Sequence, residues 1–292
     1  MKAADFLYHS ATSVEEAVRY LDDYGGAARI LAGGQSLVPM LNMRLWRPSA
    51  LIDINAVTEL ANIQVRGEET LVGALVRHVT IETSAVIATR LPLLSLMIRC
   101  VGDPQIRNRG TLGGSLVQAD PSAEMPLGCL VLGARLHVIG RRGNREIAIE
   151  SFYEGSYATA LAVDELLTDI VFPPHPPHFA FREISRRHND FAVAAVAATG
   201  HRDADGRWHQ LRIGLGGVHD TPILATTAMA LVEGSALTDE VIAAAEVEAQ
   251  RTISPTSDMR ASEAYRRHLV GVYVRRVLVA LRTSALSPGA LA

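Results

Sequence analysis

A glycine-rich tetrapeptide near the N-terminus has the composition of an anion-binding turn. Residues 33–36 read Gly-Gly-Gln-Ser and lie between two apolar segments. Glycines let the backbone turn sharply and direct successive N–H groups at one point, which suits a phosphate, and Gln35 and Ser36 add side-chain donors. A helix N-terminus directly after the turn would strengthen this attraction. On its own, an ordinary tight turn explains the tetrapeptide equally well.

The same arrangement occurs again about eighty residues later. Residues 111–115 read Thr-Leu-Gly-Gly-Ser, so a pair of glycines again has hydroxyl side chains on both sides. Charge-assisted N–H···O⁻ bonds are strong where water is excluded, so neutral donors can hold a diphosphate. The two loops together predict one ligand whose diphosphate is bound mainly by backbone amides. They are not the dinucleotide fingerprint, because no G-x-G-x-x-G follows a strand.

The polar segment around the second loop contains further candidate ligands. Glu124 is a candidate acceptor for ribose hydroxyls, which would place it at the sugar of a nucleotide. Asp120, directly before a proline, is expected to form a turn or a helix cap. The arginines of residues 103–109 either pair with phosphate or fix the segment by salt bridges, and we favour the salt bridges.

The residue types also exclude several kinds of chemistry. Lys2 is the only lysine, so the chain has neither the lysine of a P-loop nor one for a pyridoxal phosphate Schiff base. Two cysteines, Cys100 and Cys129, are too few for an iron–sulfur cluster or a cysteine-rich zinc site and are expected to be reduced core residues. The motifs H-E-x-x-H and G-x-S-x-G are absent, and a metal site at His175 and His178 is not expected. The pattern favours a bound cofactor that performs the chemistry.

Length, charge and hydropathy restrict the class of protein. A chain of 292 residues has room for about two domains of roughly 150 residues each. The formal net charge is −3, without a basic stretch interleaved with aromatics, which argues against nucleic-acid binding. No apolar stretch approaches the roughly 20 residues that span a bilayer, and no secretory signal is recognisable, so we expect a cytoplasmic protein.

The elements that position the two loops can be read from periodicity and turn residues. Residues 13–16 have capping-box spacing and precede a helical pattern that should end at Gly25 and Gly26. Further along the chain we expect strands at 29–32, 51–54, 63–65, 71–75, 135–139 and 146–149, and helices at 37–45, 81–90, 93–100 and 125–132. Residues 102–124 form a long polar, glycine-bearing segment.

The last third of the chain has a different organisation. The proline-rich residues 173–177 form the best linker candidate, because prolines stiffen a segment and do not pair in sheets. Beyond them three strands are expected at 179–185, 191–199 and 208–215, with a hairpin turn at 203–206. The tail from residue 226 onward is predicted to be helical. Strands followed by helices favour an α+β domain.

Both loops, in their order, resemble a known protein family. Residues 32–41 (AGGQSLVPML), residues 103–116 (DPQIRNRGTLGGSL) and Ala-Asp-Pro at 119–121 are similar to motifs of the FAD-binding medium subunit of molybdenum hydroxylases, the carbon monoxide dehydrogenase and xanthine dehydrogenase group. Residues 164–173 and 181–186 are similar to the later flavin-contacting stretch of that family. The resemblance covers nearly the whole chain.

The resemblance implies an α+β fold. A two-lobed FAD-binding domain of the PCMH type would occupy residues 1–176, with lobes at about 1–58 and 59–176. A C-terminal α+β domain of the dehydrogenase flavoprotein type would follow at 177–292, with a three-stranded antiparallel sheet and helices.

Individual cofactor contacts follow from the same resemblance. Glu124 falls where the family places a carboxylate on the cofactor, Leu167 would contact the flavin, and Phe191 matches a position near the isoalloxazine ring. Val101 and Ile106 are weaker candidates for its opposite face. The full implied set is Ile30, Leu31, Ala32, Gly33, Gly34, Gln35, Ser36, Leu37, Val101, Ile106, Thr111, Leu112, Gly113, Gly114, Ser115, Asp120, Glu124, Leu167, Arg182 and Phe191.

Two of these positions depart from the family pattern. Ser115 replaces a frequent asparagine and shortens the reach of the side chain. Arg182 stands where many relatives have lysine, which keeps a positive charge near the flavin but changes its geometry. Some relatives carry an extra iron–sulfur cluster on an inserted loop, and with only two cysteines this chain should lack it.

The function implied is that of an FAD-binding electron-transfer subunit. A large partner subunit would oxidise substrate at a molybdenum cofactor, a small partner would pass the electrons on through two [2Fe–2S] clusters, and FAD would deliver them to a terminal acceptor. Such complexes are usually dimers of heterotrimers. One alternative is a self-contained FAD-dependent oxidoreductase that acts on its own small-molecule substrate. Another is a non-catalytic binding module whose glycine loops are plain turns.

Overall fold

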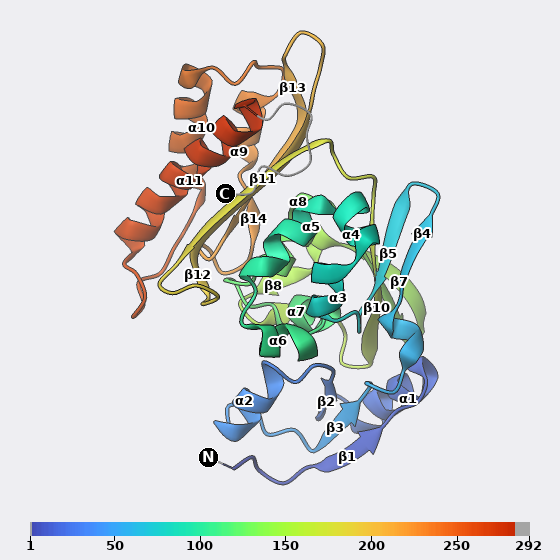
Figure 1. The fold of residues 1–292 in the computed structure, drawn as a ribbon. Helices are drawn as coiled ribbons and strands as arrows, with labels where there is room; N and C mark the ends of the chain where they lie inside the picture. The colour runs from blue at the N-terminus through green and yellow to red at the C-terminus, as the bar shows by residue number, and fades with distance from the viewer. Residues whose placement is uncertain (1, 284–292) are drawn as a thin grey trace.

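The computed structural model describes residues 2–283, which form three larger sheets and one two-stranded ribbon, with helices packed on and between them (Figure 1). The N-terminal lobe, blue in Figure 1, lies at one end of the molecule. The helix-rich second lobe occupies the middle, and the C-terminal sheet and its helices lie at the other end.

The first lobe is a small parallel sheet covered by one amphipathic helix. Its elements are β1 (Leu7–Ser10), α1 (Val14–Tyr24), β2 (Ala28–Leu31), α2 (Leu37–Asn42) and β3 (Ala50–Asp53), and the strand order is β1-β3-β2. The predicted start of α1 is confirmed, because the Ser13 hydroxyl accepts a hydrogen bond from the Glu16 N–H at 3.2 Å. The helix ends at Gly25 in the left-handed conformation, also as predicted.

The second lobe is an antiparallel sheet with a cluster of short helices. The sheet has the order β4-β5-β10-β6-β7, so its central strand β10 is the last of the five in the chain. Its strands are β4 (Ile63–Arg66), β5 (Glu69–Gly73), β6 (Arg135–Gly140), β7 (Gly143–Ala148) and β10 (Glu165–Phe172), and the ribbon pairs β8 (Tyr153–Gly155) with β9 (Ala158–Thr159). The helices are α3 (His78–Thr83), α4 (Ala85–Arg90), α5 (Pro92–Met97), α6 (Pro104–Arg109), α7 (Leu112–Gln118) and α8 (Glu124–Val131).

The polar, glycine-bearing segment at residues 102–124 contains two short helices, α6 and α7, which were not predicted. Pro104 is at the first turn of α6, where a missing N–H costs nothing, and Thr111 caps α7. The second predicted loop, residues 111–115, is therefore the cap and first turn of a helix. Both cysteines are free thiols, as predicted, and Cys129 is buried in α8.

The C-terminal sheet is antiparallel with the order β11-β12-β13-β14. The three predicted strands are present as β11 (His178–Ser185), β12 (Ala192–Arg202) and β13 (Trp208–Gly216), and the two-residue strand β14 (Ile223–Leu224) adds a fourth. The prediction of three strands missed β14 because two residues give no periodic signal. Helices α9 (Thr226–Val232), α10 (Asp239–Thr252) and α11 (Glu263–Thr283) follow. Residues 253–262 interrupt the predicted helical tail, and residues 284–292 lie outside the described part of the chain.

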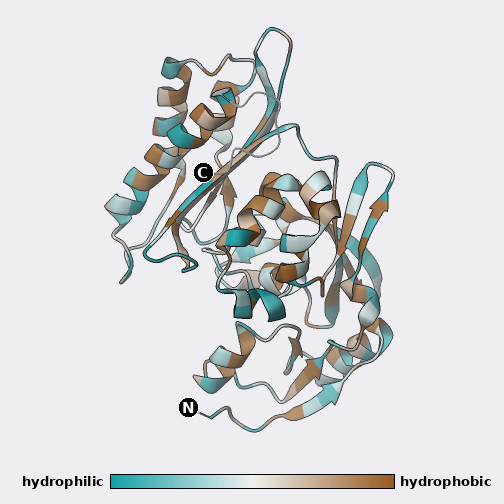
Figure 2. Cartoon of the chain, viewed as in Figure 1, coloured by the Kyte–Doolittle hydropathy of each residue, from teal (hydrophilic) through white to brown (hydrophobic). Residues whose placement is uncertain are grey.

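Strand β12 is buried on both faces, because helices pack on each side of it. The packing of α8 on one face joins the C-terminal sheet to the second lobe. Residues 192–200 are all buried, and small side chains dominate them. Helix α11 covers one face, while α8 packs on the other, where a Cβ added to Gly214 would collide with the Val131 side chain. Helices α10 and α11 show both hydrophobic and hydrophilic colours along their length, as expected for helices packed on one side (Figure 2).

Candidate functional site

The two glycine segments meet at the seam between the first and second lobes. Gly33 is buried, and a Cβ added to it would collide with the carbonyl oxygen of Arg109 and lie 2.9 Å from Gly110 Cα. The first segment is therefore in backbone contact with the residues directly before the second. Gly33 is required by this close approach.

The first segment presents unused backbone donors. Within the described part of the chain, no acceptor is present for the N–H groups of residues 34–37, where strand β2 has ended and α2 begins. Gly34 has a φ of +72°, and Ser36, two residues later, is in the right-handed region, so the chain turns sharply between the end of β2 and the start of α2. The Gln35 side chain donates instead to the carbonyl of Gly33 at 3.0 Å and so stabilises the turn.

The second segment differs, because its backbone donors are already engaged. The N–H groups of Leu112 and Gly113 donate to Val76 and Ala74 at 3.0 and 2.9 Å, and that of Gly114 donates to the Thr111 hydroxyl at 3.1 Å. Gly114 is nevertheless exposed, and Ser115 is partly exposed beside it. Of the two segments, only the first therefore has free backbone amides for the predicted diphosphate. The second segment offers the Ser115 hydroxyl and a surface without side chains.

The polar residues flanking the second segment have structural partners. The Asp120 carboxylate accepts a hydrogen bond from the Ser122 N–H at 2.9 Å, which confirms the predicted turn. Arg107 pairs with Glu82 at 2.8 Å and donates to the carbonyl of Gly102 at 2.6 Å, so for this arginine the salt-bridge hypothesis is confirmed. The Arg109 side chain forms no ion pair with a carboxylate of the described residues.

A second group of candidate residues lies where the second lobe meets the C-terminal sheet. Glu124, at the start of α8, is only 6% exposed, and burial followed by the nearby charge of Glu183 raises its pKa to about 8. Burial likewise raises the pKa of Glu183 to about 7, and its Oε2 atom is buried without a hydrogen-bond partner. Cys100 is beside Glu183, and burial raises the pKa of its thiol to about 12. Three separate segments thus bring titratable groups together.

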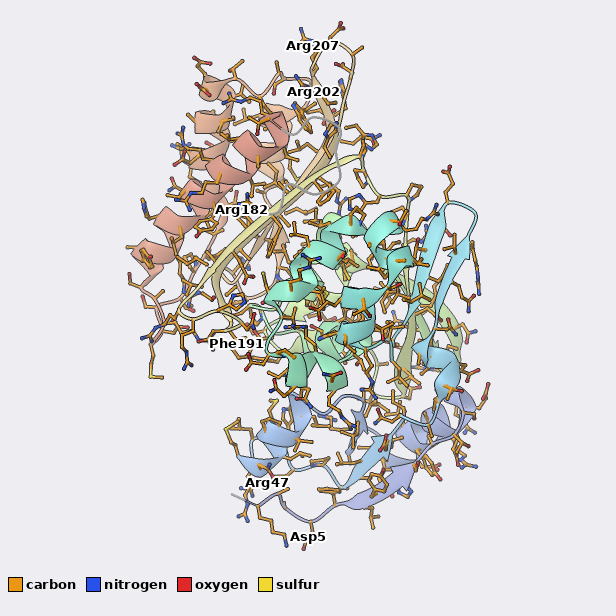
Figure 3. The ribbon with its side chains drawn as sticks, in the orientation of Figure 1. Asp5, Arg47, Arg182, Phe191, Arg202 and Arg207 are labelled. Atoms are coloured by element: carbon orange, nitrogen blue, oxygen red, sulfur yellow. The ribbon has the colours of Figure 1, made fainter. Side chains whose placement is uncertain are left out.

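The orientation of β11 decides which of its residues faces this cluster. Phe181 packs in the core of the second lobe, whereas Ala180 and Ile184 pack in the C-terminal core. Because side chains alternate along a strand, Glu183 shares the face of Phe181, and Arg182 lies on the opposite face. Arg182 is labelled on β11 in Figure 3. Glu183 is not among the residues predicted from the sequence. A period-2 count places Glu183 on the same face as Phe181, but the packing of β11 determines that this face meets the cluster.

Phe191 lies at the end of the segment that leads into β12. Its ring is 49% exposed, and the Arg260 guanidinium covers it at 4.7 Å from the ring centroid (Figure 3). Asn189, in the left-handed region, donates to Asp103 at 3.5 Å and places this segment beside α6.

The remaining candidates are distributed over the two cores and the seam. Leu167 is buried in the second-lobe core opposite Val138, and Ile106 is 38% exposed and packs against Gly102, next to Val101. Ile30 and Ala32 pack on the core of the first lobe, Leu31 contacts Gly34, and Leu37 begins α2. Helices α2 and α7 approach each other, since the Gln118 amide lies 3.5 Å from Met40 Sδ.

Neither a metal centre nor a membrane span is found in residues 2–283. No group of three or more His, Cys, Asp or Glu there could hold a metal ion. His175 accepts a hydrogen bond from the Leu93 N–H at 3.3 Å, which gives this histidine a structural role. No helix in the same range is long and apolar enough to cross a bilayer.

Two known protein families together match almost the whole length of this chain. Residues 3–175 match the family described as the FAD binding domain in molybdopterin dehydrogenase. Residues 179–281 match the C-terminal domain of the CO dehydrogenase flavoprotein.

Individual relatives cover nearly the full length. The chain is 39% identical over 280 residues to the alpha subunit of the 6-hydroxypseudooxynicotine dehydrogenase complex of Paenarthrobacter nicotinovorans, which is 95% of each chain. It is 37% identical to the nicotine 6-hydroxylase medium subunit of the same organism, over 96% of this chain and 98% of that one. A chain of the reconstituted CO dehydrogenase from Oligotropha carboxidovorans superposes with a TM-score of 0.95 at 33% identity, covering 98% of this chain and 100% of that one.

The fold and the two matched families define an FAD-binding oxidoreductase subunit. More closely, the chain belongs to the FAD-binding medium subunits of the molybdenum hydroxylase family, as its sequence motifs indicate.

Proposed function

We propose that this chain takes electrons from a [2Fe–2S] partner subunit and passes them from its FAD to a terminal acceptor, while a large molybdenum-cofactor subunit oxidises the substrate. The complex would be a cytoplasmic dimer of heterotrimers. The observation that carries the proposal is the seam, where the free N–H groups of residues 34–37 directly follow Gly33, which packs against Arg109 and Gly110 just before the cap of α7.

The donor set fits the diphosphate of FAD. Four successive N–H groups without acceptors require an anion or water, and the seam contains no lysine that would compete for the role. The partly exposed hydroxyl of Ser115 would add a neutral donor from the other lobe, while the buried Thr111 hydroxyl caps α7. FAD supplies the hydride and single-electron chemistry, and the protein supplies binding and orientation.

The remaining cofactor contacts are part of the same proposal. Glu124 would accept from the sugar-like hydroxyls of the cofactor, and Phe191 would lie near the isoalloxazine ring. Glu183 joins this set because it shares the buried cluster with Glu124. Arg182 is a weaker candidate for a cofactor contact, because its guanidinium donates to the carbonyl of Phe181 at 2.9 Å.

The proposed division into domains is supported by the bounds of the two family matches. We place the FAD-binding domain at residues 1–176, with lobes 1–58 and 59–176, and the C-terminal domain at 177–292. The two family matches end and begin at residues 175 and 179, on either side of the end of the proline-rich segment.

Absorption spectroscopy of the protein purified with its partners tests the proposal. We expect flavin absorption bands, release of FAD on acid treatment, and bleaching when the substrate of the molybdenum subunit is added. A complex that contains no flavin and takes up none would refute FAD binding. Bleaching of the chain by a substrate in the absence of its partners would instead favour a self-contained oxidoreductase.

A further inference from the structure

Arg77 and Asn55 form a side-chain connection between the two lobes that neither sequence motif includes. Asn55 follows β3 in the first lobe, and Arg77 precedes α3 in the second. The Arg77 guanidinium donates from Nη2 to the Asn55 side-chain oxygen at 2.5 Å and from Nη1 to the carbonyl of Arg109. The Arg77 side chain thus contacts both Asn55 of the first lobe and Arg109, whose carbonyl lies against Gly33.

The connection continues into the first glycine segment through Asn55. Its amide donates to the carbonyl of Ala32 at 2.9 Å, directly before Gly33, and to the Asp53 carboxylate at 2.6 Å. The Asp53 carboxylate also accepts from the Asn55 N–H at 2.8 Å and from the Tyr8 hydroxyl at 2.6 Å. The Asn55 amide is therefore fixed in one orientation, with its oxygen toward Arg77.

Arg77 is attached equally firmly to the second segment, through its backbone. Residue 77 forms a β-bridge with Thr111, and the flanking hydrogen bonds run from the His78 N–H to Gly110 and from the Leu112 N–H to Val76, both at 3.0 Å. An uninterrupted path therefore leads from the cap of α7 through Arg77 and Asn55 to Ala32.

We infer that Arg77 and Asn55 are positioning residues that hold the two halves of the FAD diphosphate site in register. This inference rests on the proposed FAD function. The path fixes the spacing between the free N–H groups of residues 34–37 and the Ser115 hydroxyl of α7. Losing it should loosen this register locally, because the close approach of Gly33 to Arg109 and Gly110 is a packing contact without a directional bond. The lobes themselves stay joined, since Leu75 and Leu166 of the second lobe pack in the core of the first.

A direct contact between Arg77 and the diphosphate is the rival explanation, because the guanidinium is a cation near the site. Burial lowers the pKa of Arg77, the nearby charge of Arg109 lowers it further, and that of Asp53 raises it. Two arginines and one carboxylate leave this part of the seam with a net positive charge. The two explanations differ in one measurable respect. A positioning role requires Asn55, whereas a direct contact of Arg77 with phosphate does not.

A double-mutant cycle in the complete complex tests the inference. The variants Arg77→Met, Asn55→Ala and their combination are compared for FAD affinity by fluorescence titration of the deflavinated complex. Each single change should weaken FAD binding about 10-fold to 100-fold, the value of a hydrogen bond to a charged group, and the double variant should bind no more weakly than the weaker single variant.

The controls separate this inference from the proposed function. Arg66→Met removes a charge from β4, where the guanidinium donates to Gln64, and should leave FAD affinity unchanged. Arg77→Lys, which keeps the charge with fewer donors, should be impaired nearly as much as Arg77→Met, with circular dichroism establishing that each variant is folded. Multiplicative losses in the double variant, or full affinity in Arg77→Lys, would overturn the positioning role. Failure of the unaltered complex to bind FAD would overturn the proposed function instead.

Discussion

At the scale of single residues, Gly33 has the most restrictive environment in the site. Its own backbone conformation is open to other residues, but the carbonyl of Arg109 occupies the space of a side chain. Replacement with alanine must therefore push the two lobes apart or distort the turn. The neighbouring residue Ser36 is exposed, and its side chain makes no capping hydrogen bond to α2.

Gly33→Ala should lower both stability and FAD affinity. Overpacking of this kind costs about 1–3 kcal/mol of unfolding free energy, measured by urea titration. Ser36→Ala is the matched control and should change stability by less than about 0.5 kcal/mol. If Gly33→Ala were as stable as the control, the contact between Gly33 and Arg109 would not exist in solution.

At the scale of elements, α7 depends on its cap. It has only seven residues, two of them glycines, and its intrinsic helix propensity is low. The Thr111 hydroxyl oxygen accepts from Gly114, and bonds to Val76 and Ala74 occupy the preceding N–H groups. The local sequence therefore supplies the cap of α7. The carbonyls that accept from its next N–H groups come from residues about forty positions earlier in the chain.

Thr111→Ala should destabilise the protein by about 1 kcal/mol, because the N–H of Gly114 loses its acceptor. Thr111→Ser keeps the oxygen and should recover most of the loss. Urea unfolding of the two variants beside the unaltered protein measures the difference. Equal stability of the alanine and serine variants would show that the cap contributes nothing.

The same elements explain how much the sequence could predict. Helix α1 was predictable because its capping box, apolar spacing and terminal glycine all lie within thirteen residues. Helices α6 and α7 were not, since glycines and polar residues hide their pattern and remote carbonyls stabilise α7. The two glycine motifs identified the ligand class, but the contact of Gly33 with Arg109 and the bridge through Arg77 depend on how the lobes pack. The facing of β11, and with it Glu183, required the same long-range information.

At the scale of the whole molecule, two buried histidines make a destabilising contribution at acid pH. Burial lowers the pKa of His78 and of His175 to about 4, and His78 is only 5% exposed. In the unfolded chain both would titrate near pH 6.5. Between these values each of the two histidines is more protonated in the unfolded state than in the folded state, so their contribution to stability falls as the pH decreases from about 6.5 to 4. The raised pKa values of Glu124 and Glu183 act in the opposite direction.

Replacing His78 with glutamine should remove the part of the stability loss at acid pH that comes from this histidine. The full contribution of His78 to the loss is on the order of 3 kcal/mol, obtained by multiplying the pKa difference by about 1.4 kcal/mol per unit. The measurement is the unfolding free energy at several pH values, compared as a slope. His209→Gln is the control, because Asp203 raises the pKa of that exposed histidine and its removal cannot flatten the slope. An unchanged slope in the His78 variant would contradict the assignment.

The position of β10 has a consequence for the order in which the protein is made. This strand is central in its sheet, between β5 and β6, yet it is the last of the five strands to leave the ribosome. Until residues 165–172 have been synthesised, the hairpins β4–β5 and β6–β7 each keep an unpaired edge, which is open to association with other chains. More than half of the chain must therefore be synthesised before the seam can be assembled. FAD can bind at the seam only after that stage of synthesis.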